Sequence, residues 1–125
     1  MPDLVVTVPK RLWRMWIDEG DCPGDPPTGD ESSFYVGHRR RPNIAPGERL
    51  YIVCWGRLRG YAPVTRVVQK RQGWAICREG GAVAVTIRPF HWLARIKGFR
   101  GWRYRWWDIC IEVPFPGWKT DEVGR

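Results

Sequence analysis

Glycines and prolines cut this sequence into short segments, and their spacing constrains the fold more than any other feature. Fourteen glycines and eleven prolines are spread over 125 residues. Most segments between them are rich in β-branched and other apolar residues, which favour strands. The predicted strands cover residues 4–8, 34–37, 50–55, 61–68, 73–78, 82–88 and 102–113. Residues 10–19 are the exception, because their apolar residues recur at the spacing of one helical face.

The order of these segments predicts how they assemble. It contains no alternating strand–helix rhythm, so we expect a single α+β, mainly β domain over residues 1–125. A small, mostly antiparallel barrel or a strongly bent sheet fits this pattern. We predict a turn at 56–60, a hairpin connection at 79–81 and a helical turn or bend at 90–97. Residues 18–33 are expected to form an acidic loop rich in proline and glycine, and residues 114–125 a C-terminal tail.

The chain carries a large surplus of positive charge. Lys and Arg number 21 against 13 Asp and Glu, which gives a net charge of +8 and a pI near 9.9. Residues 18–31 contain acids and no base, so the remaining surface is more basic still. A solvated acidic loop is expected there, and a divalent-cation site is the alternative, although the spacing departs from the calcium-loop pattern. A basic surface attracts polyanions such as nucleic acids.

Several other classes of protein find little support in the sequence. No segment approaches the ~20 apolar residues of a membrane span, and the N-terminus lacks a signal-peptide pattern. We therefore expect a cytoplasmic protein without a membrane partner. The four cysteines, at 22, 54, 77 and 110, lack zinc-ligand spacing and are expected to be buried free thiols, with a four-thiolate metal site as the alternative. No catalytic motif is present, so we predict no metal, cofactor or catalytic residue and leave enzymatic activity open.

Three stretches combine arginines with aromatic rings and glycines, and they carry the predicted binding site. They cover residues 34–41, 55–61 and 99–107. Rings stack on bases and guanidinium groups bind phosphate. An extended 102–106 segment would place its rings on one face and its guanidinium groups on the other. Alternatively, the rings fill the core and the arginines only face water. The predicted nucleic-acid- and base-binding residues are Tyr35, Arg39, Arg40, Arg41, Trp55, Arg57, Arg59, Trp102, Arg103, Tyr104, Arg105 and Trp106.

A turn at Pro46–Gly47 leads into the apolar run 50–53, and Gly60 opens a second run that ends at Val67. Together with residues 34–37, this pattern resembles the central strands of the PUA-like superfamily, in particular its EVE and ASCH branches. The resemblance implies a pseudo-barrel of five to seven mostly antiparallel strands with one or two flanking helices. It also implies an aromatic-walled pocket for a modified base, which maps to Tyr35, Trp55, Trp102 and Trp106. ASCH-type hydrolases carry a lysine-containing stretch after the first helix, and residues 17–22 contain no lysine.

The sequence therefore predicts a nucleic-acid-binding module with a base-binding aromatic pocket and an arginine-rich rim. A small ASCH-like hydrolase acting on a nucleoside derivative is one alternative, and a protein-interaction module is another. The choice between RNA and DNA, the identity of the base and the oligomeric state are left open.

Overall fold

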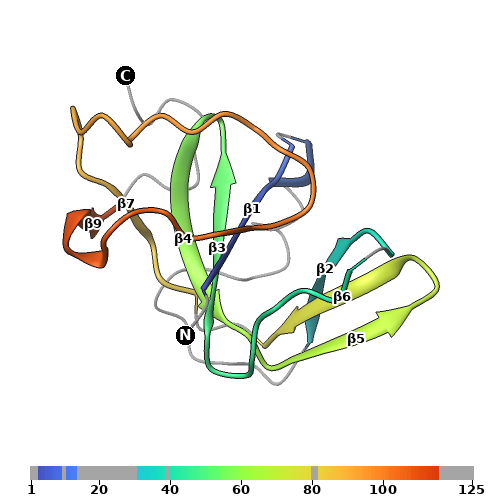
Figure 1. Ribbon diagram of the computed structural model, residues 1–125. Helices are drawn as coiled ribbons and strands as arrows, with labels where there is room; N and C mark the ends of the chain where they lie inside the picture. The colour runs from blue at the N-terminus through green and yellow to red at the C-terminus, as the bar shows by residue number, and fades with distance from the viewer. Residues whose placement is uncertain (1–2, 10, 14–30, 39, 80–81, 116–125) are drawn as a thin grey trace.

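The computed structural model describes residues 3–9, 11–13, 31–38, 40–79 and 82–115. Within these ranges the chain forms nine short strands, one turn of 3₁₀ helix, η1, and a short helical stretch at residues 11–13 (Figure 1). The fold is therefore mainly β, as predicted. The strands are β1 (Leu4–Thr7), β2 (Ser32–Val36), β3 (Arg49–Cys54), β4 (Arg57–Pro63), β5 (Arg66–Lys70), β6 (Gly73–Arg78), β7 (Val85–Ile87), β8 (Arg103–Tyr104) and β9 (Glu112–Pro114), and η1 covers Ile109–Ile111.

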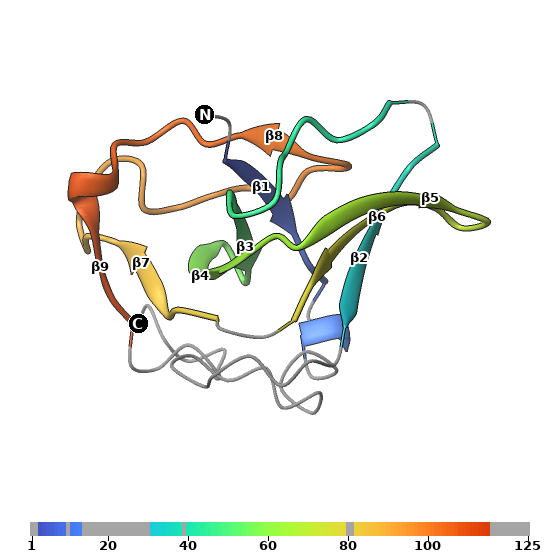
Figure 2. The same cartoon turned by 90° about the horizontal axis from the view of Figure 1, so that it is seen from below.

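These strands belong to three separate sheets. The largest has the order β4-β3-β1-β8, and in it β1 and β3 run parallel while the other pairs are antiparallel. A second sheet has the order β2-β6-β5, and β7 pairs with β9 in a third. Figure 2 shows the largest sheet lying between the other two. The described strands form no closed barrel, so the expected closure is not seen among them.

The core consists of two apolar clusters, one on each face of the largest sheet. Because side chains alternate along a strand, Leu4 and Val6 enter one cluster and Val5 enters the other. The first cluster includes Val36 and Ile76 from the second sheet, whereas the second includes Ile87 from β7. Burial on both faces explains why β1 and β3 are almost continuously apolar instead of alternating with polar residues.

The predicted hairpin across residues 79–81 is wrong. Strand β6 pairs with β2 on one side and β5 on the other, whereas β7 pairs with β9 in a different sheet. Both edges of β6 are therefore already occupied by hydrogen bonds. The hairpin that does form joins β5 to β6 through residues 71–72, a connection that the sequence analysis missed.

Two other predicted boundaries are also corrected. The predicted turn at 56–60 is a two-residue turn at Trp55 and Gly56, and β4 starts directly after it. The predicted strand at 61–68 is in fact parts of two strands in different sheets, β4 and β5, and the chain passes from one sheet to the other at Val64 and Thr65. There the backbone of Gly47 donates to the carbonyl of Val64, and the backbone of Thr65 donates to that of Cys77. The predicted strand at 102–113 contains only β8, η1 and the start of β9.

The predicted helix begins as expected. Residues 11–13 are helical, and the carbonyl of Pro9 accepts hydrogen bonds from the backbone of Leu12 and Trp13. Trp13 is buried in the first cluster. The rest of this predicted helix, most of the acidic loop at 18–33 and the tail from residue 116 lie outside the described residues. Among the helical residues that the structure describes, none belongs to a helix long and apolar enough to span a bilayer.

Candidate functional site

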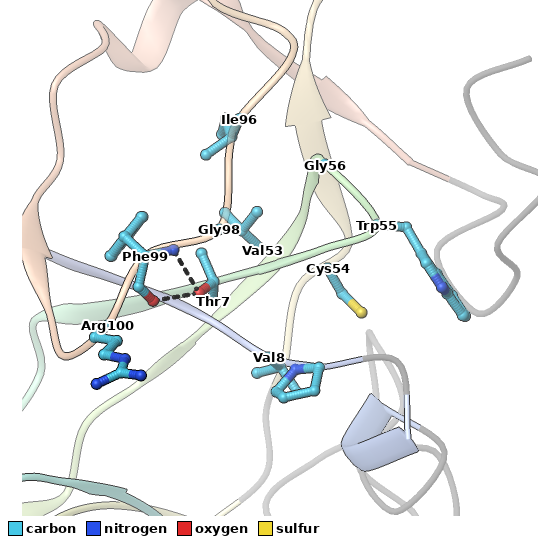
Figure 3. Close-up of a pocket in the computed structure, with 11 residues that line it drawn as sticks. Thr7, Val8, Val53, Cys54, Trp55, Gly56, Ile96, Gly98, Phe99 and Arg100 are labelled. Carbon is cyan, nitrogen blue, oxygen red and sulfur yellow. Dashed lines mark hydrogen bonds between the residues drawn. The ribbon is translucent and has the colours of Figure 1, made fainter.

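A cavity of about 420 Å³ opens where the parallel strands β1 and β3 end (Figure 3). Its walls come from the end of β1, from the turn between β3 and β4, and from the long segment that precedes β8. This volume falls within the range of small-molecule pockets. The lining residues are Thr7, Val8, Pro9, Val53, Cys54, Trp55, Gly56, Ile96, Gly98, Phe99 and Arg100.

Hydrogen bonds from β1 and from the turn between β3 and β4 hold the 96–100 segment in place as one wall of this cavity. The Thr7 hydroxyl donates to the carbonyl of Phe99 at 2.7 Å and accepts from the Phe99 amide at 3.2 Å. The amide of Ile96 donates to the carbonyl of Gly56 at 2.8 Å. Because both ends of the segment are tied to the largest sheet, the wall is positioned before any ligand arrives.

Trp55 occupies an unusual backbone conformation at another wall of the cavity. Its φ is +53° and that of Gly56 is +71°, so the two residues form the tight turn that joins β3 to β4. Asn, Asp or Gly normally occupy the first of these positions, since a bulky residue at positive φ is strained. Such strain costs about 1–3 kcal/mol and concentrates at functional sites. The Trp55 ring is half-buried, and the Arg59 guanidinium lies 4.5 Å from its centroid.

Arg59 belongs to the core and not to an exposed rim. Its neighbour Leu58 enters one apolar cluster, so the alternation along β4 sends Arg59 to the opposite face. The side chain is completely buried, and its Nε donates to the carbonyl of Cys54 at 2.9 Å. Its guanidinium also lies 5.5 Å from the Phe115 ring and 5.9 Å from that of Trp13. In this position the Arg59 guanidinium packs against the Trp55 ring and does not face solvent.

A pair of rings, one just before β8 and one on it, meets the basic loop after β2. The rings of Trp102 and Tyr104 are 5.4 Å apart and nearly perpendicular. The Arg40 guanidinium lies 4.6 Å from the Trp102 centroid, and Asn43 Nδ2 donates to the Tyr104 hydroxyl at 2.9 Å. Arg40 and Tyr104 are exposed, so a cation and a ring meet at the surface.

The opposite side of β8 points toward the cavity wall. Arg103 is exposed, and its guanidinium lies 4.3 Å from the Phe99 ring. Trp106 also contacts Phe99, at 6.1 Å between centroids. The predicted alternation of rings and cations therefore holds from residue 102 to 104 and ends there. Arg105 instead turns to the chain start, with its Nε 3.4 Å from Asp3 Oδ2, and its guanidinium donates to the carbonyl of Trp107.

The other predicted residues that the structure describes do not belong to the cavity lining. Tyr35 is exposed on β2 in the second sheet, and the Arg41 guanidinium lies 5.9 Å from the Trp74 ring of the same sheet. Arg57 lies 4.9 Å from the Phe115 ring. Arg39 lies outside the described residues. Of the predicted residues, the structure therefore places Trp55 in the cavity lining and Arg103 against Phe99 of that lining, and it groups Arg40 with Trp102 and Tyr104.

Of the eleven residues that line the cavity, only Trp55 belonged to the predicted set, and Phe99, Arg100 and Thr7 are among those that it lacked. Phe99 and Arg100 begin the third basic aromatic stretch, so their neighbourhood was a signal that could have found them. Thr7 had no such signal, because its hydrogen bonds join residues 92 positions apart.

The described lining of the cavity is mostly apolar, with a few polar groups. Its described lining contains rings, aliphatic groups, one hydroxyl, one thiol and one guanidinium, and no carboxylate, histidine or lysine. In the part of the chain that the structure covers, no group of three His, Cys, Asp or Glu side chains is placed to hold a metal ion. Cys54 and Cys77 are buried, as predicted, whereas Cys110 is exposed on η1.

Comparison of the chain with protein-family models, with curated proteins and with solved structures found no match.

Proposed function

We propose that this protein binds nucleic acid through the cavity and the arginine–ring pairs around β8. The observation that carries the proposal is the placement of guanidinium groups on rings on both sides of one short strand. Arg40 lies over Trp102 on one side, and Arg103 lies over Phe99, a cavity wall, on the other. A guanidinium held on a ring presents its edge to a phosphate, and a neighbouring ring accepts a base.

The charge of the chain supports a polyanionic ligand. The net charge is +8, and Arg40, Arg100 and Arg103 are all exposed near the cavity. Cations that neutralise phosphates release counterions, which supplies most of the sequence-independent affinity. In this proposal the exposed arginines contact the backbone, while Trp55 and Phe99 line the space that receives a base.

The proposed ligand of the cavity is a single base, including a modified one, as the PUA-like resemblance implies. We propose that the three short sheets together belong to a PUA-like pseudo-barrel. A hydrolase within the same fold would need an acid or base in the cavity. The described lining offers no carboxylate, histidine or lysine for this role, so the binding role is the better supported of the two.

The experiment is a titration of the full chain with labelled RNA and DNA oligomers at several salt concentrations. We expect log affinity to fall linearly with log salt concentration. Replacing Arg103 or Arg40 by Ala should weaken binding to oligomers of every sequence to a similar degree. It should also reduce the slope of log affinity against log salt concentration by about 1. Arg71→Ala is the matched control, because Arg71 is exposed in the turn between β5 and β6, in a different sheet.

Affinity that does not change between low and high salt would argue strongly against the proposal. If Arg71→Ala lost as much affinity for the oligomers as Arg103→Ala, the net charge alone would attract the nucleic acid and there would be no site at β8.

A further inference from the structure

The two most exposed aromatic side chains that the structure describes lie on one turn. Phe90 is 105 % exposed and Trp92 is 83 % exposed. Between them, the ring of His91 stacks on that of Trp92, with centroids 5.9 Å apart and planes inclined by 22°. We call residues 90–92 the aromatic turn. Neither large ring contributes to the core, so packing does not explain these residues.

The aromatic turn is built to hold its rings outward. The amide of His91 donates to the carbonyl of Arg88, the amide of Ala94 donates to that of His91, and the Leu93 amide donates to His91 Nδ1. Phe90 has a φ of +68°, a conformation that costs energy for a bulky residue. Because the Phe90 ring is fully exposed, burial of that ring does not offset this cost. Strain of this kind points to a role in binding.

The surroundings of the aromatic turn are cationic. Arg88, Arg95 and Lys97 are all exposed on the same segment. The amide of Arg88 donates to the carbonyl of Ile111, which fixes the base of the turn to the end of η1. The turn therefore combines exposed rings with positive charge on a fixed support, which suits stacking on bases beside phosphates.

The same segment continues directly into the cavity wall. Trp92 lies four residues before Ile96, which lines the cavity and is tied to Gly56. Four residues span at most about 14 Å even when fully extended. A strand with one base in the cavity therefore has its next few nucleotides within reach of the aromatic turn.

We propose that Phe90 and Trp92 stack on unpaired bases that flank the base held in the cavity, so that the ligand is single-stranded. This inference rests on the proposed function and adds the form of the nucleic acid to it. A ring needs the free face of a base, and in a duplex both faces are covered by neighbouring pairs. Insertion into a duplex would first have to unstack it, which costs energy that a single strand does not require.

The test measures the affinity of the wild-type chain and of the double variant Phe90→Ala/Trp92→Ala for two probes. One probe is a labelled, mixed-sequence single strand of about eight nucleotides, prepared as DNA and as RNA, within the usual site size. The other is the corresponding duplex. Ile109→Ala is the matched control, because Ile109 is an exposed apolar residue on the neighbouring η1. Circular dichroism spectra check that all variants are folded.

We expect the wild type to prefer the single strand and the double variant to bind it at least about ten-fold more weakly, with Ile109→Ala unchanged. Equal affinities of wild type and double variant for the single strand would overturn this inference and leave the proposed function intact. A wild type that binds neither probe would overturn both. Binding to phosphatidylserine vesicles that depends on Phe90 and Trp92, with unchanged affinity for nucleic acid, would assign the turn to a membrane surface instead.

Discussion

Arg59 and Arg103 both lie beside aromatic rings, yet their surroundings give them different physical roles. Arg59 is completely buried and donates to a backbone carbonyl, whereas Arg103 is exposed and covers one ring of the cavity wall. A buried guanidinium stabilises only while its contacts are complete, because its hydration has been lost. An exposed guanidinium keeps its water and remains available to a ligand.

We therefore expect Arg59→Ala and Arg103→Ala to separate stability from binding. Truncating Arg59 removes a fully buried side chain, and it should lower the free energy of unfolding by about 3 kcal/mol or more. Truncating Arg103 should change it by about 0.5 kcal/mol or less. Urea denaturation of both variants measures the difference. Unfolding of Arg59→Ala at the wild-type urea concentration would contradict the core role of this residue.

Cys110 offers a prediction about pH at the same scale. The nearby Asp108 carboxylate, which accepts a hydrogen bond in this pair, is the largest cause that raises the pKa of the Cys110 thiol. A raised pKa means less thiolate at a given pH and slower alkylation. Asp108→Asn should therefore speed alkylation of Cys110 by iodoacetamide at pH 8, read for this residue alone by peptide mass spectrometry. Alkylation at the wild-type rate would show that the carboxylate has no influence on the thiol.

At the scale of elements, the β5–β6 hairpin depends on one glycine. Gly73 has a φ of +131°, and a Cβ at this position would collide with the backbone carbonyl oxygen of Val36 in the paired β2. Gly47 also has a positive φ, of +88°, but a Cβ there would meet no atom within 4 Å. The two glycines therefore share the need for positive φ and differ in the space around them.

Gly73→Ala should accordingly destabilise the protein far more than Gly47→Ala. We expect Gly47→Ala to lower the free energy of unfolding by about 1–2 kcal/mol, because of the backbone conformation alone. For Gly73→Ala we expect about 4 kcal/mol or more, because two backbones must separate. Thermal unfolding followed by circular dichroism compares the variants. Equal midpoints for the two would show that β2 moves away from β6 without cost.

At the scale of the whole molecule, the surplus of positive charge should make the stability of the folded chain depend on a bound anionic ligand. A ligand that binds only the folded state stabilises it by mass action, by about 2.7 kcal/mol at a hundred-fold excess over Kd. For a chain of this length that shift raises the unfolding midpoint by roughly 10 °C. Single-stranded oligomers should produce this rise at low salt, and added NaCl should progressively remove it. A midpoint that is insensitive to oligomers would contradict the proposed function in the folded chain.

Some features of this fold could be predicted from the sequence alone, and others could not. Short β-branched segments between glycines and prolines were enough to predict a mainly β chain, because strand preference depends on neighbouring residues. The surplus of arginine and the ring-rich stretches were also visible without coordinates. Which strands pair was not predictable, and the rejected 79–81 hairpin shows why: β6 pairs with strands before it in the chain, and β7 with one far after it.

Charge and ring content follow from the amino-acid sequence alone, whereas burial follows from contacts between distant segments. Nothing local distinguishes Arg57 from Arg59, yet only the second is completely enclosed. Nothing local links Thr7 to Phe99 or leaves Phe90 uncovered, because those outcomes depend on which surfaces the packed sheets occupy. Long-range packing therefore decided where a cavity opens and which cations remain at the surface.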